Sequence, residues 1–181
     1  MARLVLVTGG CRSGKSAFAQ RLAESLPGRR AYLATAPIID EEMRQRVERH
    51  RQARAAAEWQ TIEAPLDLAG AIASAAGQFD VVLIDCLTLW LNNLMFQADQ
   101  AGQSFTEDDA AAKCDTLLAS CRGFVGTIVI VTNEVGMGIV PDNTIARRYR
   151  DLVGRANQVV AASADSVHFV VSGITLTLKG G

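Results

Sequence analysis

Short runs of apolar residues alternate along the chain with longer stretches in which apolar residues recur at helical spacing. Continuous apolar runs of this length are typical of strands buried on both faces, so they predict a parallel sheet whose strands are connected by helices. The predicted strands are 3–8, 30–35, 59–63, 80–85, 126–133, 166–173 and 175–178. The predicted helices are 15–26, 41–54, 66–76, 87–98, 106–122 and a long one from Pro141 to about residue 162. Residues 97–109 are the best candidate for a surface loop.

Length and composition narrow the class of protein. With 181 residues, 49% hydrophobic and 20% charged, the chain suits one globular domain, residues 1–181. Residues 81–96 form the longest apolar run, but Asp85, Asn92 and Asn93 interrupt it, so we expect no membrane span. The start "MARLVLVTGG" reaches glycine before a full apolar segment, which argues against a signal peptide.

Charge and cysteine usage add two expectations. Eighteen basic and nineteen acidic residues give a net charge of −1 and a pI of about 6.1, which argues against a nucleic-acid partner. Cys11, Cys86, Cys114 and Cys121 show no metal-ligand spacing. Cys114 and Cys121 are seven residues apart on one predicted helix and are expected to be core thiols. We therefore expect a reducing, cytoplasmic compartment.

The stretch "GGCRSGKS" fits the phosphate-binding pattern G-x-x-x-x-G-K-[ST]. A predicted strand precedes it and a helical stretch follows, which is the context that this motif requires and that a chance glycine-rich turn lacks. Glycines let successive backbone N–H groups face an anion at the N-terminus of a helix. Lys15 would reach the β- and γ-phosphates, and Ser16 would bind Mg²⁺. The predicted cradle comprises Gly9, Gly10, Cys11, Arg12, Ser13, Gly14, Lys15 and Ser16.

Asp85 ends a buried apolar strand, where a second acidic residue of phosphate-loop proteins holds Mg²⁺ directly or through water. The alternative is an aspartate that caps a strand end or a helix. The loop upstream favours the metal. The chain is therefore predicted to bind a nucleoside triphosphate, although the motif does not select the reaction.

The stretch "RVERHRQAR" places a lone imidazole, His50, among guanidinium groups. On a helical wheel Met43, Val47 and His50 share one stripe, so His50 faces the protein body. One interpretation is a packed histidine beside a solvated helix face. The other is a nucleophile that attacks an α-phosphorus and releases pyrophosphate, with arginines stabilising the phosphoryl charge. The surrounding arginines are Arg46, Arg49, Arg51 and Arg54.

The chain resembles the bifunctional adenosylcobinamide kinase/adenosylcobinamide-phosphate guanylyltransferases of cobalamin biosynthesis over essentially its whole length. The motifs that carry the resemblance are "LVTGGCRSGKS", "YLATAPIIDEEMRQRVERHR", "VTNEVGMGIVPDN" and "RRYRDLVGRANQ". The third is the most specific. The resemblance implies an α/β P-loop NTPase fold with a mostly parallel sheet flanked by helices, similar to the recombinase core, and a homotrimer.

The resemblance also implies roles for particular residues. His50 takes GMP covalently from GTP, and Arg49 stands where family members often carry another histidine. Glu63 could accept hydrogen bonds from guanine N1–H and the 2-amino group, the alternative being a surface carboxylate. The implied nucleotide contacts are Gly9 to Ser16, Thr35, Ala36, Pro37, Arg51, Gln52, Ala53, Arg54, Glu63 and Asp85.

Three further residues are placed by pattern. Asn133 and Glu134 follow a predicted strand at the same sheet edge, where a nucleotide-sensing, metal-orienting or substrate role is open. His168 lies inside an apolar strand and is expected to be in the core.

Two activities would then share one cradle. A γ-phosphoryl group from ATP or GTP would pass to the hydroxyl of adenosylcobinamide, and GMP would pass through His50 to adenosylcobinamide phosphate, giving adenosylcobinamide-GDP. Two other functions stay open on the residues themselves. One is a plain small-molecule kinase with an inert His50, and the other is a recombinase-type ATPase stimulated by nucleic acid.

Overall fold

A computed structural model describes residues 2–36 and 58–180. The predicted helix 41–54 lies outside these residues, and so do the site predictions for Pro37, His50, Arg51, Gln52, Ala53 and Arg54.

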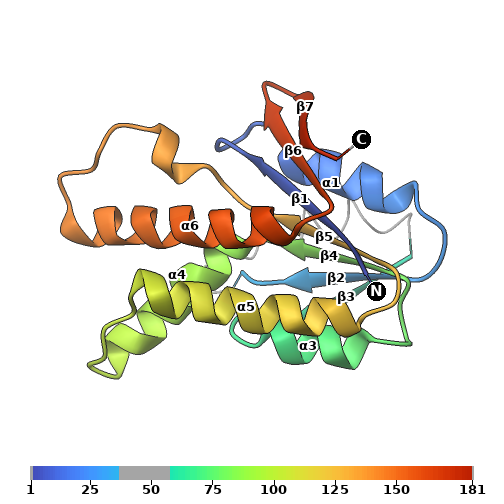
Figure 1. Cartoon of the computed structure of the whole chain (residues 1–181), viewed down its shortest axis with the longest axis horizontal. Helices are drawn as coiled ribbons and strands as arrows, with labels where there is room; N and C mark the ends of the chain where they lie inside the picture. The colour runs from blue at the N-terminus through green and yellow to red at the C-terminus, as the bar shows by residue number, and fades with distance from the viewer. Residues whose placement is uncertain (1, 37–57, 181) are drawn as a thin grey trace.

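The described chain forms a seven-stranded sheet in the order β3-β2-β4-β5-β1-β6-β7 (Figure 1). The first six of these strands pair in parallel, and β7 pairs antiparallel with β6. This arrangement confirms the predicted α/β fold with a mostly parallel sheet. The strands are β1 Arg3–Gly9, β2 Arg30–Ala34, β3 Trp59–Glu63, β4 Val81–Asp85, β5 Thr127–Val131, β6 Ser166–Val171 and β7 Ile174–Lys179.

Helices cover both faces of the sheet (Figure 1). They are α1 Lys15–Glu24, α3 Leu68–Ala75, α4 Leu87–Gln100, α5 Glu107–Gly123, α6 Thr144–Ser163 and the short 3₁₀ helix η2 Val135–Met137. α1 packs on one face with a smaller apolar cluster, whereas α3, α4, α5 and α6 bury the larger cluster against the other. No helix within the described residues is both long and apolar enough to cross a membrane.

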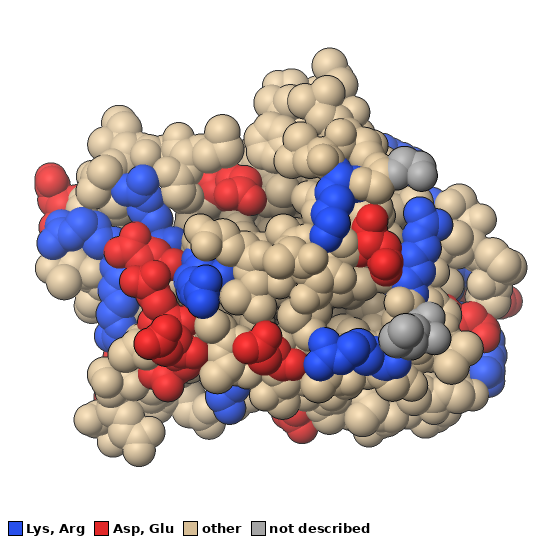
Figure 2. All heavy atoms as spheres, in the orientation of Figure 1, with Lys and Arg blue, Asp and Glu red and all other residues tan. Residues whose placement is uncertain are grey.

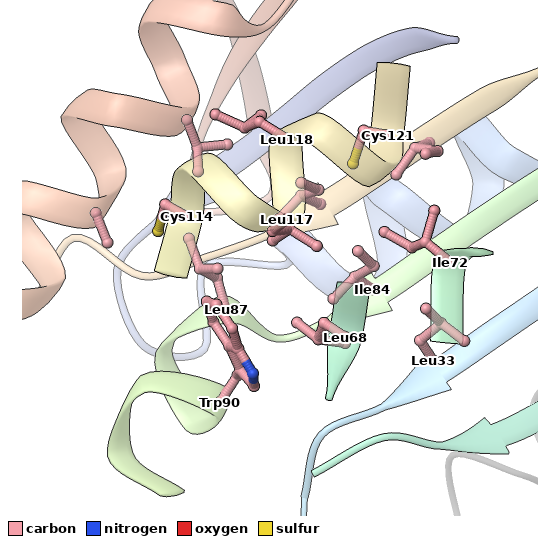
Figure 3. Packing of buried hydrophobic residues seen from close by; sticks show 14 of the residues in the cluster. Leu33, Leu68, Ile72, Ile84, Leu87, Trp90, Cys114, Leu117, Leu118 and Cys121 are labelled. Atoms are coloured by element: carbon pink, nitrogen blue, oxygen red, sulfur yellow. The ribbon is translucent and has the colours of Figure 1, made fainter. Parts of the chain in front are cut away.

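The larger cluster joins strands and helices that are far apart in sequence (Figure 3). Leu33 of β2 and Ile84 of β4 meet Ile72 of α3 and Leu117 of α5, and all four are fully buried. Burying each such side chain contributes about 1.5–3 kcal/mol. This packing fixes β2 and β4 side by side and so fixes the positions at which both strands end.

Cys114 and Cys121 lie in the same cluster, as predicted, and both thiols are free. Burial raises the pKa of each thiol to about 12, so both stay protonated at neutral pH.

The predicted loop 97–109 is confirmed only for residues 101–106, because α4 continues to Gln100 and α5 begins at Glu107. A capping box between Thr106 and Asp109 starts α5. Across the turn, the guanidinium of Arg148 donates to the Asp99 carboxylate at 3.0 Å and to the Phe105 carbonyl at 3.2 Å. These contacts come from α6 and order a segment whose polar composition had indicated a loop.

Candidate active site

Parallel pairing brings the predicted polar residues to one edge of the sheet. Ala34, at the end of β2, is in register with Glu63 of β3 and with Asp85 of β4. Asp85 is in register with Val131 of β5, which leads into Asn133 and Glu134. The phosphate loop leaves β1 at this same carboxyl edge, where ligands bind in open α/β sheets.

The loop from Gly9 to Ser16 requires glycine at two points. Gly9 has φ +156°, and a Cβ there would collide with the backbone carbonyl of Val170 in β6. Gly14 caps α1 in the left-handed region at φ +97°. The loop therefore packs closely against the β6–β7 turn and leads directly into the N-terminus of α1, as the motif predicted.

Two side chains of the loop bear on anion binding. The Nζ of Lys15 donates to the carbonyl of Gly10 at 2.9 Å, so the ammonium group reaches across the loop. The Oγ of Ser13 is buried and makes no hydrogen bond to any described residue. An unsatisfied buried hydroxyl costs about 1–3 kcal/mol, a cost that a phosphate oxygen would offset.

Asp85 is half-buried, and its Oδ2 accepts a hydrogen bond from the Tyr32 hydroxyl at 3.1 Å. The charges of Asp85 and Lys15 both affect the pKa of the neighbouring Cys86 thiol. Burial and then the Asp85 carboxylate raise the Cys86 pKa, while hydrogen bonds and the Lys15 ammonium oppose that rise. Cys86 therefore stays a protonated thiol rather than a nucleophile.

The donor set fits a hard cation. Ser16 and Asp85 offer only oxygen ligands, which Mg²⁺ prefers. Within the described residues, no group of three His, Cys, Asp or Glu side chains could hold a metal by itself. Mg²⁺ in phosphate-transfer sites commonly takes one or two protein ligands and completes its shell with water and phosphate oxygens.

Thr35 is fully buried at the end of β2 and ties that strand to β4. Its hydroxyl donates to the Cys86 carbonyl at 2.9 Å and accepts from the Cys86 N–H at 2.8 Å. The amide of Asn93 donates to the Thr35 carbonyl at 2.8 Å. These bonds give Thr35 a structural role at the edge, and its nucleotide contact stays a prediction, as does that of the half-buried Ala36.

Glu63 is exposed on β3, at the far end of the same edge. Four strand steps separate β3 from β1 in the sheet, which at about 4.8 Å per step places them about 19 Å apart. A nucleotide that contacts both Glu63 and the phosphate loop therefore has to lie along the edge, across β2, β4 and β5.

A buried polar network beside the loop was not found from the sequence. Thr8 at the end of β1 donates to Glu134, and Asn157 of α6 bonds Thr132 and Glu134. Thr8 and Glu134 are 126 residues apart in the chain. A polar residue at the carboxyl end of a buried strand was the available signal for Thr8.

His168 is half-buried on β6 rather than in the core. Its ring meets Phe18 edge-on at 5.3 Å between centroids, and its Nδ1 lies 3.2 Å from the Thr177 hydroxyl. The prediction that His168 lies in the core was wrong. In the sheet, β6 has only the edge strand β7 beyond it, so its side chains are less covered than those of the central strands.

Comparison with known proteins agrees with this geometry. The family model described as cobinamide kinase/cobinamide phosphate guanyltransferase matches residues 5–178. The chain is 41% identical to the bifunctional adenosylcobalamin biosynthesis protein CobU of Salmonella typhimurium, covering 97% of this chain and 99% of that one. Identity to the Escherichia coli CobU protein is 42% with the same coverage. Identity to the Pseudomonas aeruginosa CobP protein is 41%, covering 97% and 96%.

The match spans nearly the whole chain and confirms the resemblance and the two predicted activities, a kinase and a guanylyltransferase. The chain therefore belongs to the cobinamide kinase/cobinamide phosphate guanyltransferase family.

Proposed function

We propose that this protein phosphorylates adenosylcobinamide with ATP or GTP and then transfers GMP from GTP to the product through a guanylyl-histidine at His50. The observation that carries the proposal is that the phosphate loop, with Lys15, and Asp85 lie at the same carboxyl edge of the parallel sheet.

In the kinase step, the acceptor hydroxyl oxygen attacks the γ-phosphorus and the bond from that phosphorus to the β,γ-bridging oxygen breaks. The loop N–H groups and the α1 N-terminus hold the phosphates. Lys15 stabilises the charge that gathers on the departing β-phosphate. ADP or GDP leaves.

In the guanylyl step, a nitrogen of His50 attacks the α-phosphorus of GTP and pyrophosphate leaves. A phosphate oxygen of adenosylcobinamide phosphate then displaces the histidine, giving adenosylcobinamide-GDP. Lys15 serves this step too, because the β- and γ-phosphates that it neutralises now form the leaving group. β2 ends at Ala34, in register with Asp85 at the carboxyl edge of the sheet, and His50 follows β2 in the sequence, which supports attack in this region.

Ser16 and Asp85 are the residues that would hold Mg²⁺, which would neutralise phosphate charge when bound. The hydrogen bond from Tyr32 fixes one Asp85 oxygen and orients the other. Glu63 would select guanine by accepting from its N1–H and 2-amino groups.

A homotrimer is proposed from the resemblance. The β6–β7 hairpin supports contact with a second copy of the chain, because one of its faces exposes Val171, Ile174, Leu176 and Leu178. The lobe over this hairpin carries no charged side chain in Figure 2. Exposed apolar surface of this kind usually marks a contact surface. Light scattering of the purified protein tests the assembly, and a monomer would contradict it.

The proposal also includes two expectations, that the protein binds no nucleic acid and that it works in the cytoplasm. Basic and acidic side chains are interleaved on the face shown in Figure 2, which supports the expectation of no nucleic-acid partner. The four free thiols support a reducing, cytoplasmic compartment. Addition of single-stranded DNA should leave nucleotide hydrolysis unchanged.

The proposal is tested with two labels. With γ-labelled ATP or GTP and adenosylcobinamide, label should appear in the corrinoid product. With α-labelled GTP and Mg²⁺, label should stay on the denatured protein and then move to added adenosylcobinamide phosphate. Corrinoid phosphorylation without any protein-bound label would leave a plain kinase and contradict the guanylyl-histidine.

A further inference from the structure

We infer that Glu134 accepts the proton of the acceptor hydroxyl during phosphoryl transfer, an inference that rests on the proposed kinase activity. Glu134 follows β5, which lies between β1 and β4 in the sheet. Its backbone N–H donates to the carbonyl of Gly9 at 3.1 Å. The residue is thereby fastened to the first residue of the phosphate loop, between the loop and Asp85.

One oxygen of the Glu134 carboxylate is held by neutral donors. Its Oε1 accepts from the Thr8 hydroxyl at 2.6 Å and from the Asn157 amide at 3.3 Å. Asn157 is itself fixed, because its Oδ1 accepts from the Thr132 hydroxyl at 2.7 Å. Thr8, Thr132 and Asn157 are all buried. Among the described residues, the hydrogen bonds that orient the carboxylate all come from neutral donors.

The other oxygen, Oε2, has no hydrogen-bond or ion-pair partner among the described residues, and Glu134 is only half-buried. A carboxylate held by one oxygen and open at the other suits a proton acceptor. The two other polar side chains near this edge, Asn133 and Asp85, are less suited to accept the proton. The Asn133 amide points away to the Thr88 hydroxyl of α4 at 2.9 Å, and Asp85 accepts from Tyr32 and is the proposed metal ligand.

The step balances without a further reactant. The hydroxyl oxygen forms its bond to the γ-phosphorus, the bond to the β,γ-bridging oxygen breaks, and the hydroxyl proton passes to Oε2. The resulting carboxylic acid returns the proton to solvent after ADP or GDP departs. Guanylylation of His50 involves no hydroxyl, so it does not require this acceptor.

The test is Glu134→Gln in the full-length protein. The amide oxygen of glutamine can still accept from Thr8 and Asn157, so the network and the fold are retained while the proton acceptor is lost. We expect the kinase kcat to fall by about a hundredfold or more. The KM for nucleotide and the rate of labelling by α-labelled GTP should stay close to the wild-type values.

Two further variants sharpen the result. Glu107→Gln changes an exposed glutamate in the first turn of α5 and should leave both activities unchanged. Glu134→Asp keeps the charge but withdraws it by one methylene, so it should lower the kinase kcat to a value between those of wild type and Glu134→Gln. It also serves as the test protein if Glu134→Gln fails to fold.

Equal loss of kinase activity and α-labelling would assign Glu134 to nucleotide or metal binding and overturn the inference. Full kinase activity in Glu134→Gln, or in Glu134→Asp where only that variant folds, would overturn it as well. A wild-type protein that does not phosphorylate adenosylcobinamide would instead refute the proposed function itself.

Discussion

The backbone N–H of Gly173, in the β6–β7 turn, donates a hydrogen bond of 2.8 Å to the carbonyl of Ser13 in the phosphate loop. The hairpin thereby braces the loop from outside, beside the contact between Val170 and Gly9. The shape of the cradle depends on a segment at the other end of the chain.

Gly173→Ala tests this brace. Gly173 has φ +80°, so alanine strains the turn by about 1–2 kcal/mol and should displace it from the loop. Loss of the hydrogen bond should weaken triphosphate binding by up to about tenfold.

The control is Gly102→Ala in the α4–α5 turn, where φ is +68° and a Cβ likewise meets nothing within 4 Å. Both variants should lose similar stability in urea unfolding. If Gly173→Ala and Gly102→Ala bind the triphosphate with equal affinity in calorimetry, the hydrogen bond from Gly173 does not shape the phosphate loop.

Lys15→Ala should abolish both activities. Lys15 is the one ammonium group assigned to the β- and γ-phosphates, which surround the transferred group in one step and leave in the other. We expect losses of more than about a hundredfold in each rate. Lys113→Ala, on the exposed surface of α5, is the matched control. Near-normal turnover of either reaction in Lys15→Ala would refute a shared cradle.

Glu63→Gln should discriminate between nucleotides. If Glu63 accepts from guanine, replacing one acceptor oxygen with an amide donor should weaken GTP binding by about 1–3 kcal/mol. ATP lacks those donors and should bind as before. Competition binding measures both affinities, and equal weakening would assign Glu63 to a structural role or to a ribose contact.

His168 should make stability depend on pH. Burial first, and then the nearby Arg3 charge, lower the pKa of His168 below its ordinary value of 6.5. Between these two pKa values the unfolded chain binds more protons than the native protein. The stabilising contribution is therefore complete above about pH 6.5 and decreases as the pH falls toward the native pKa.

His168→Gln should remove this component. The free energy of unfolding, measured in urea at several pH values on both sides of 6.5, should fall less steeply with acidification in the variant than in wild type. Parallel pH profiles would show that His168 titrates alike in both states.

The order of strands and helices could be predicted from the sequence, because buried strands and amphipathic helices differ in period. Strand 80–85 was expected, and β4 covers Val81–Asp85. The lateral order of the strands could not be predicted, since it depends on which strands pack side by side. The α4–α5 connection is shorter than predicted, and Arg148 of α6, far away in the sequence, hydrogen-bonds to Asp99 and Phe105 at its two ends.

Some residues of the site could likewise be predicted from the sequence and others could not. The phosphate loop and Asp85 carry local signals, a glycine pattern and a strand-end carboxylate. The Thr8–Glu134–Asn157 network does not, because its members come from β1, the segment after β5, and α6. The sequence places Glu134 at the sheet edge with its role open, and the hydrogen bonds from Thr8 and Asn157 are the basis for the role inferred above.

The central claim concerns His50, and α-labelled GTP with Mg²⁺ tests it most directly. Wild type should retain label after denaturation, and the label should be acid-labile and base-stable, as expected of a phosphoramidate. His50→Ala should still bind GTP and phosphorylate adenosylcobinamide, because the cradle is untouched, yet carry no label and transfer no GMP. Label retained by His50→Ala, or mapped to a peptide that lacks residue 50, would contradict the account.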